Sequence, residues 1–222
     1  MHEQSTNKDA GSVTSTTLQF VSNVKVGSTL LVASRVGATG RTITVSDDVN
    51  GTYTAGPNIA QTTDGHQAYL HSFVNTAAGR PIVTYAISGV AATIRLAVLE
   101  YSQVAALDQS NQNQGTGTNA TCTDTTTAPV ELLIGAATHN NGAAAVWTAA
   151  SSGGTWTKRQ EFGGTGSCVL VEDILISTAG TYDHNPVCGA GNGNWTSLLM
   201  TFPTNVARPL PNPLPIMANG RI

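Results

Sequence analysis

Charged and aromatic residues are scarce in this sequence of 222 residues. Charged side chains make up 10%, against roughly 25% in an ordinary soluble domain. The ten basic residues are scattered along the chain. This argues against a nucleic-acid partner, because phosphate binding needs clustered Lys and Arg. No apolar run approaches the roughly 18 residues that cross a bilayer, so we expect no membrane-spanning segment and no membrane partner.

A secretory signal peptide is also lacking. Residues 1–17 have no basic region followed by an apolar one, which predicts either export by another route or a signal that has been removed. The segment is polar and has no periodicity, so we expect an N-terminal arm rather than a folded element.

Cysteine is limited to three residues, too few for a disulfide scaffold. Cys168 and Cys188 have their midpoint at residue 178, inside a predicted turn, which makes them candidates for opposite positions on paired strands. Either a cross-strand disulfide or two buried free thiols would fit this spacing. Cys122 has no partner, and three isolated cysteines do not indicate a metal site.

Small and β-branched residues are what the chain has in abundance. Hydrophobic residues reach 40%, mean hydropathy is −0.02, and 23 residues are glycine, a composition typical of a folded chain. Short alternating apolar runs separated by Gly, Asn and Ser predict an all-β protein. The predicted strands are Thr29–Arg35, Thr42–Ser46, Ala68–Asn75, Ile82–Ser88, Thr93–Tyr101, Glu131–Thr138, Trp156–Gln160, Cys168–Ser177, Tyr182–Cys188 and Thr196–Phe202.

The two halves of the chain match in order at an offset near 102 residues. STLLVAS at 28–34 parallels VELLIGA at 130–136, and NGTYTAG at 50–56 parallels GGTWTKR at 153–159. This predicts an internal duplication that folds as one jelly-roll-like or Ig-like β-sandwich of about ten strands, with each copy supplying strands to both faces. The expected domain covers 18–203, with halves 18–106 and 130–203 joined by a polar linker, 107–129.

The C-terminal segment, 204–222, is rich in proline. Prolines at 209, 211, 213 and 215 exclude a helix or a central strand and favour an extended polyproline conformation. Four apolar residues lie among or after them, which predicts a docking arm that binds its own domain or a neighbouring subunit. The candidate partner-binding residues are Leu210, Leu214, Ile216 and Met217.

Histidines and carboxylates are the first candidates for catalysis. His66 and His71 lie close to Asp64, but their odd separation places them on opposite faces of a strand. His139 and His184 lie at strand ends, where polar residues are common.

A glycosidase would need two carboxylates in one cleft. Glu172 and Asp173 are adjacent and face opposite sides, so Glu100 or Glu161 would have to join one of them. Neither this pattern nor any catalytic motif predicts an enzyme, and we expect no catalytic residue.

A metal or sugar ligand is the other kind of site considered. Asp47, Asp48 and Asn50 before Gly51 favour a tight β-turn over a calcium loop, because the closing Glu of an EF-hand is missing. We therefore predict no metal and no cofactor.

Four of the large aromatic residues suit either a sugar-stacking surface or the core of the protein. They are Tyr53, Trp147, Trp156 and Trp195.

A resemblance to a known family rests on four segments of the first half: SDDVNGTYTAG (46–56), AYLHSFVNTAAG (68–79), VTYAISG (83–89) and LAVLEYSQVAALD (96–108). They resemble a duplicated Gly/Thr-rich β-sandwich family seen in phage virion proteins and bacterial secreted proteins, over roughly residues 26–202. The shared motifs form turns and core, so the resemblance implies a fold and no catalytic residue.

These observations together predict a non-enzymatic phage virion protein, a capsid decoration or accessory subunit that binds neighbouring virion subunits through its arms and forms a homo-oligomer. The expected location is the virion. The alternatives are an extracellular carbohydrate-binding or adhesion module, with a glycan as partner, and a glycan-processing enzyme.

Overall fold

The computed structural model describes residues 1–140, 147–164, 166–189 and 191–205, and these residues form strands and no helix. The first half of the chain contributes β1 (His2–Val13), β2 (Ser15–Gln19), β3 (Thr29–Val36), β4 (Ile43–Asp47), β5 (Gly51–Thr52), β6 (Thr54–Ala60), β7 (Gln67–Phe73), β8 (Ile82–Ile87) and β9 (Ala92–Tyr101). The second half contributes β10 (Ser110–Gly117), β11 (Cys122–Thr125), β12 (Glu131–His139), β13 (Trp147–Thr148), β14 (Thr157–Gly164), β15 (Ser167–Ile176), β16 (Thr181–His184), β17 (Val187–Cys188) and β18 (Gly193–Pro203). The prediction of an all-β protein is confirmed, and all ten predicted strands overlap strands of the structure.

Each half builds its own antiparallel sheets. The first large sheet has the order β1-β9-β3-β7-β6, and the second large sheet has the order β10-β18-β12-β15-β14. A four-stranded outer sheet, β2-β8-β4-β5, belongs to the first half, and two outer strand pairs, β11-β16 and β13-β17, belong to the second.

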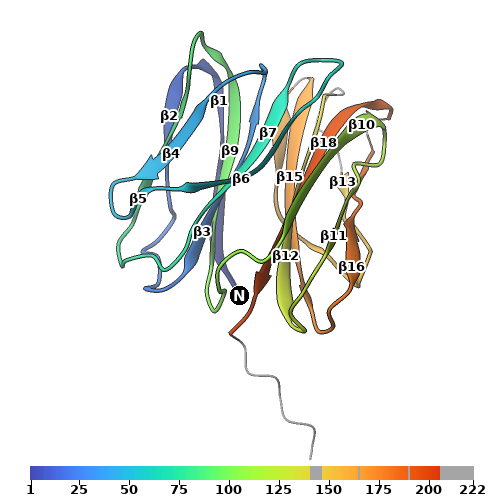
Figure 1. Ribbon diagram of the computed structural model, residues 1–222. Coiled ribbons are helices and arrows are strands. Elements are labelled where there is room, and N and C mark those ends of the chain that lie inside the picture. The colour runs from blue at the N-terminus through green and yellow to red at the C-terminus, as the bar shows by residue number, and fades with distance from the viewer. Residues whose placement is uncertain (141–146, 165, 190, 206–222) are drawn as a thin grey trace, which may run out of the picture.

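The two large sheets pack face to face, with the outer sheets on their far sides (Figure 1). Strand β1 lies against β14 at one edge of this interface, and β6 lies against β10 at the other. The central core between the large sheets draws on both halves. Its residues are Leu31, Ala33, Ala68, Leu70, Ala97, Leu99, Tyr101, Val104, Leu132, Ile134, Ala136, Val169, Val171, Leu198, Met200 and Phe202.

Strands β3 and β12 show why the large sheets lie in the middle. Every residue of both strands is buried, as expected of a sheet that is covered on both faces. In β3, Leu31 and Ala33 belong to the central core, whereas Leu30 and Val32 belong to the core under the first outer sheet. A nearly continuous apolar run, rather than strict alternation, encodes this position.

The expected single sandwich of about ten strands is therefore too simple. Neither large sheet mixes strands of the two halves, and the described residues form several sheets in addition to the central pair. The sequence pattern does not reveal the polar strands, such as β1 and β10. With these strands, each half completes a large sheet of its own.

Two expected connecting segments are strands. Residues 1–17 do not form an arm outside the fold, since β1 pairs with β9 from His2↔Tyr101 to Val13↔Ala92. The expected linker, 107–129, contains β10, which pairs with β18, and β11, which pairs with β16. Both β1 and β10 are edge strands of their sheets, and an edge strand needs little apolar surface because backbone pairing holds it.

The end of the described chain is fixed. Strand β18 ends at Pro203, Thr204 bridges to Val104, and the backbone N–H of Asn205 donates to the Gln103 carbonyl at 3.0 Å. Residues Leu210, Leu214, Ile216 and Met217 of the predicted arm lie outside the described residues.

Because the central core joins the halves, truncating it should destabilise the whole chain. We expect Leu99→Ala to lower the free energy of unfolding by about 2–5 kcal/mol through lost burial and a residual cavity. Leu175→Ala, at a side chain that is 45% exposed, is the control and should change it by less than about 0.5 kcal/mol. Chemical denaturation measures both, and equal small effects would contradict the shared core.

Candidate functional site

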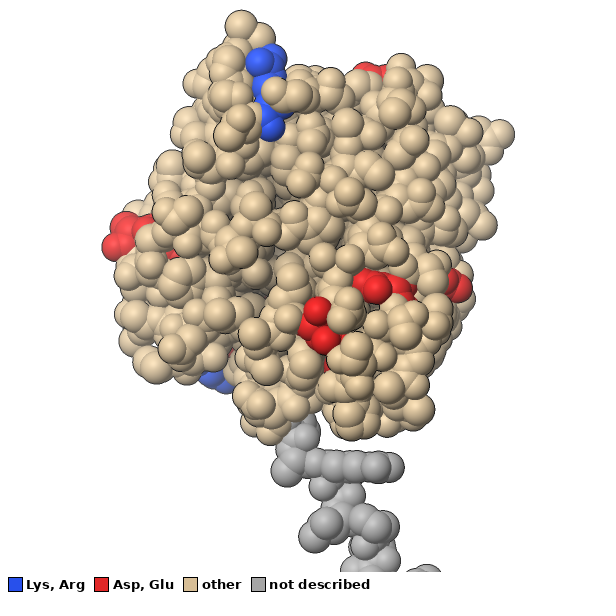
Figure 2. Space-filling view, in the orientation of Figure 1, with Lys and Arg blue, Asp and Glu red and all other residues tan. Residues whose placement is uncertain are grey.

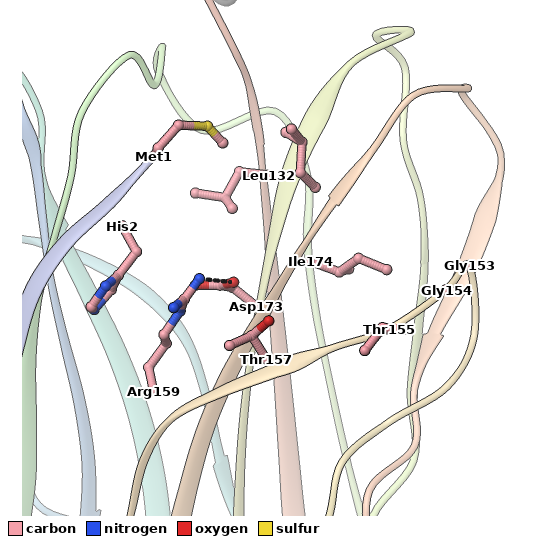
Figure 3. Close-up of a pocket in the computed structure, with 11 residues that line it drawn as sticks. Met1, His2, Leu132, Gly153, Gly154, Thr155, Thr157, Arg159, Asp173 and Ile174 are labelled. Atoms are coloured by element: carbon pink, nitrogen blue, oxygen red, sulfur yellow. Dashed lines mark hydrogen bonds and ion pairs between the residues drawn. The ribbon is translucent and has the colours of Figure 1, made fainter.

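A cleft of about 400 Å³ opens where the start of β1 meets β14 and β15 (Figure 3). Its volume falls within the range of about 300–1,000 Å³ that is usual for small-ligand sites. Both halves of the chain contribute to its walls. The lining residues are Met1, His2, Leu132, Gly153, Gly154, Thr155, Thr157, Arg159, Asp173, Ile174 and Leu175.

An ion pair between Arg159 and Asp173 occupies one wall of the cleft. Arg159 donates from Nε to Asp173 Oδ2 at 2.6 Å and from Nη2 to Asp173 Oδ1 at 3.0 Å. Asp173 faces Thr157 in the register, and the β14–β15 pairing shifts by one residue between Lys158 and Gln160. This bulge leaves Arg159 outside the regular ladder, and bulges commonly redirect a side chain in this way.

The first half of the chain supplies a third member of this network. The Tyr101 hydroxyl, from β9, donates to Asp173 Oδ2 at 2.8 Å. Burial and the nearby Asp173 carboxylate raise the pKa of Tyr101 well above its ordinary value, so the phenol stays a donor. Burial lowers the pKa of Arg159, but the bonds with Asp173 outweigh this effect and the net pKa is raised.

His2 stands beside the pair. Its ring lies edge-on to Tyr101, with 5.4 Å between centroids. Burial, together with the Arg159 charge, lowers the pKa of His2, which favours the neutral imidazole. The buried Nε2 of His2 has no hydrogen-bond partner among the described residues.

A tight turn closes the far end of the cleft. Gly153 has φ +79° and Gly154 has φ +135°, conformations that favour glycine. A Cβ at Gly153 would also lie 2.5 Å from the Tyr182 ring, so this turn cannot carry a larger residue at that position.

A second hollow of about 230 Å³ lies at the opposite edge of the central interface, where β6 approaches the segment before β10. Thr54 pairs with Ser72 there, as Thr157 pairs with Asp173, and a register shift follows between Ala55 and Asn58. The lining is small or apolar and includes no charged residue: Thr54, Ala55, Gly56, Ser72, Val74, Ala106 and Leu107.

His66 belongs to a buried relay between the halves, away from the lining of either hollow. Its Nδ1 lies 2.7 Å from Asp64 Oδ1 and its Nε2 lies 2.8 Å from Thr138 Oγ1. Thr138 Oγ1 lies 2.6 Å from Thr196 Oγ1. Asp64, His66 and Thr138 follow the acid–imidazole–hydroxyl order of a hydrolase triad. His66 and Thr138 are each 1% exposed, however, so a substrate could not reach the hydroxyl. We interpret the relay as a structural tie across the interface.

The other histidines lie in separate surroundings. His71 packs on Tyr69, facing the outer core rather than His66, as the sequence predicted. His139 Nε2 lies 3.0 Å from the Gly117 carbonyl. His184 Nε2 lies 3.2 Å from Glu172 Oε1, with both side chains fully buried.

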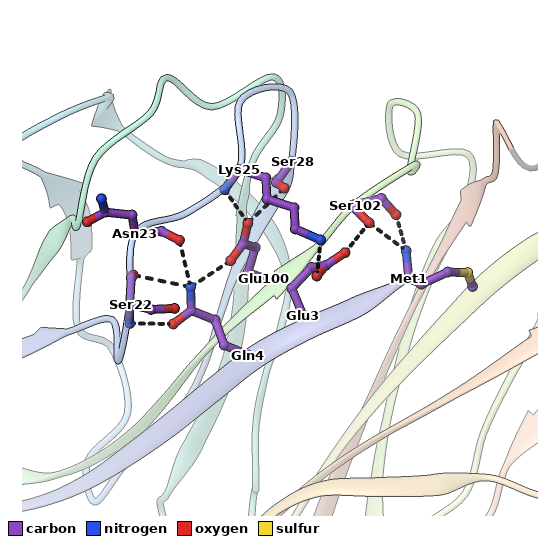
Figure 4. Close-up of polar contacts among 9 residues, drawn as sticks. All are labelled: Met1, Glu3, Gln4, Ser22, Asn23, Lys25, Ser28, Glu100 and Ser102. Carbon is purple, nitrogen blue, oxygen red and sulfur yellow. Dashed lines mark hydrogen bonds and ion pairs between the residues drawn. The ribbon is translucent and has the colours of Figure 1, made fainter.

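The four carboxylates considered for catalysis do not converge. Glu172 and Asp173 face opposite sides of β15, as predicted, and of the four only Asp173 lines the cleft. Glu161 pairs with Lys158 at 2.6 Å. Glu100 accepts from the Lys25 backbone, the Ser28 hydroxyl and the Gln4 amide (Figure 4), where it fixes the connection between β2 and β3 against β9.

The segment from Asp47 to Gly51 is a turn, as expected. Asp47 Oδ1 accepts from the backbone N–H groups of Val49 at 2.8 Å and Asn50 at 2.5 Å, and Gly51 has φ +94°. Among the described residues no group of three His, Cys, Asp or Glu side chains could hold a metal ion.

Of the two alternatives for the four large aromatic residues, the structure shows burial in the core rather than a sugar-stacking surface. Trp147, Trp156, Trp195 and Tyr53 are all buried, with exposures of 1%, 3%, 6% and 4%. They fill the cores beneath the outer strands, and this leaves none of their ring faces for a ligand.

The three cysteines are buried free thiols. The expected placement of Cys168 and Cys188 at opposite positions of one strand pair is wrong, because Cys168 pairs with His139 and Cys188 pairs with Trp147 in different sheets. They nevertheless share one apolar cluster. Burial, then the neighbouring Cys188, raises the pKa of Cys168 to about 12.

Comparison with known proteins gives no relative: no family model, no curated protein and no solved structure matches this chain. The part of the chain that the structure describes contains no helix that could span a membrane.

The buried histidines make stability depend on pH. Burial lowers the pKa of His2, His66, His71 and His139, for His71 to about 4. The unfolded chain then binds more protons than the folded chain between about pH 6.5 and pH 4, so the free energy of unfolding falls as pH falls through this window.

We expect His71→Leu to reduce the slope of that dependence by up to about 1.4 kcal/mol per pH unit, because one proton uptake is removed. Urea unfolding at a series of pH values measures it, with Leu175→Ala as a control that should keep the full slope. An unchanged slope in His71→Leu would show that this histidine already titrates normally in the folded protein.

Proposed function

We propose that this protein is a non-enzymatic structural protein of a phage virion, a capsid decoration or accessory subunit that binds neighbouring subunits through its C-terminal segment. It acts by association alone. The proposal includes a homo-oligomeric state, in which the segment 206–222 of one copy contacts another copy.

The observation that carries the proposal is the fixed point from which this segment leaves. Asn205 and Thr204 are held by the connection that follows β9, beside the start of β1 (Figure 1). A segment that begins at a rigid point searches a smaller volume than one on a loose linker, which raises its effective concentration near a neighbour.

Charge supports association between copies. Two of the ten basic residues, Arg208 and Arg221, and none of the thirteen acidic residues lie in 206–222. The formal charge is therefore +2 for this segment and −5 for residues 1–205. The folded part carries few charges on the face shown in Figure 2, so apolar contacts by Leu210 and Leu214 meet little desolvation cost from charged neighbours.

The similar organisation of the two halves supports the predicted internal duplication as part of the same proposal. Strands β1, β9, β3, β7 and β6 take the same order in their sheet as β10, β18, β12, β15 and β14 in theirs. Because each half covers its own large sheet with outer strands, the segment after Asn205 is not needed to cover a core and can contact other subunits.

Deleting residues 206–222 should abolish self-association and leave the fold intact, because no residue of a described strand is removed. Light scattering coupled to size exclusion measures the mass of the assembly, and circular dichroism checks the β content. The paired substitution Leu210→Ser with Leu214→Ser should act in the same direction, and Asn212→Ser is the matched control that should associate normally.

The virion setting has its own test, co-sedimentation with purified phage particles. The full chain should bind to saturation and the truncated chain should not. Equal sedimentation of both chains, or truncated protein that keeps its assembly mass, would contradict the role of the segment.

A further inference from the structure

We propose that the cleft at Arg159 and Asp173 binds a neutral polyhydroxylated ligand, a single sugar residue, held by paired hydroxyl groups. This goes beyond association through the C-terminal segment and does not depend on it.

The two edges of the central interface share one strand arrangement but differ in charge. Thr157, Arg159 and Asp173 surround one hollow, whereas Thr54, Gly56 and Ser72 occupy the corresponding register positions of the other. Both edges keep the strand pairing and the register shift. Because the strand pairing and the register shift form at the second edge with no charged residue there, they do not require Arg159 at the first, and its guanidinium can serve a ligand while Asp173 also holds Tyr101.

The charge of the cleft selects the chemistry of that ligand. Arg159 and Asp173 cancel each other, so a free anion would meet the carboxylate and a cation would meet the guanidinium. A hydroxyl group both donates and accepts. A ligand with two hydroxyls on adjacent carbons can therefore bind both partners. One hydroxyl can donate to Asp173 Oδ1, which already accepts one bond from Arg159 Nη2. The other can accept from Arg159 Nη1, which takes no part in the ion pair.

The remaining walls suit the rest of a sugar ring. The hydroxyl-bearing Thr155 and Thr157 line the cleft together with the apolar Leu132 and Ile174 (Figure 3). A sugar presents hydroxyl edges and C–H faces to such a mixed lining. His2 also lines the cleft, and its buried Nε2 has no hydrogen-bond partner among the described residues.

The site is organised before a ligand arrives. Asp173 is 4% exposed, and three bonds from Arg159 and Tyr101 fix its carboxylate. A hydrogen bond to a fixed, largely dehydrated group is stronger than one to a solvated side chain. Among the described residues that line the cleft, His2 has the only aromatic ring. Recognition therefore depends on hydroxyl orientation, and we expect a dissociation constant of about 1–10 mM for one residue.

Saturation-transfer NMR and titration calorimetry on the full chain test this, with D-glucose, D-galactose, D-mannose and N-acetyl-D-glucosamine as probes. At least one of them should bind with a dissociation constant in the expected range. Thr157→Val should weaken that binding about 3- to 10-fold through loss of one hydrogen bond, and Thr157→Ser should restore it.

Thr54→Val is the matched control, because Thr54 holds the same register position at the edge without the ion pair. It should leave the dissociation constant unchanged. Thr157→Trp, which fills the cleft, should abolish binding, and the melting temperature of each variant verifies folding.

Three outcomes would overturn the proposal. They are no binding by any of the four sugars at about ten times the expected dissociation constant, equal weakening by Thr54→Val and Thr157→Val, or binding of glucuronate or acetate in preference to every neutral sugar. Because the C-terminal segment is intact in all these variants, a failure here leaves the association tests unaffected.

Discussion

The central core between the two large sheets is the contact on which the rest of the structure depends. Residues such as Leu31 and Leu99 from one half meet Leu132 and Leu198 from the other, and every element outside this layer covers one of the two sheets. Apolar area removed from water is the main favourable term in folding, and the apolar cluster that joins the two halves of the chain is this one layer. Neither large sheet could leave this face in water and remain stable.

Polar ties surround that layer. His66 reaches Thr138 at one end, Tyr101 reaches Asp173 at the other, and Arg95 donates to Ser167. Such bonds add little net stability individually, but an unmatched partner in the interface would be costly. They therefore fix the way in which the halves align, and the candidate cleft is a consequence of that alignment because its walls come from both halves.

Apolar patterning in the sequence is sufficient to locate the buried strands. Runs such as those of β3, β12 and β15 are visible because a strand covered on both faces needs apolar residues at nearly every position. The polar edge strands β1 and β10 are not visible in this way, since backbone hydrogen bonds define them and their side chains are half-buried or exposed. Because the sequence pattern does not reveal these strands, it predicts a single sandwich where the structure has several stacked sheets.

The cleft could be predicted only in part. Asp173 was a candidate carboxylate, and its orientation opposite to Glu172 follows from the two-residue period of a strand. Arg159 depends on a bulge that the alternation of residues does not reveal, and His2 lies in residues 1–17, where the polar sequence predicts an arm and the structure has β1. The sequence leaves two roles open for the large aromatic residues, and the structure places them in the cores, because a chain with only 5% aromatics needs its large rings there.

The most direct test of this account asks whether the two halves unfold together. All three tryptophans lie in the second half, so their fluorescence follows that half, while amide hydrogen exchange of β3 and β7 follows the first. A shared core predicts coincident transitions in denaturant with the same midpoint from both probes. Two separate transitions, with one half remaining folded after the other has opened, would contradict it.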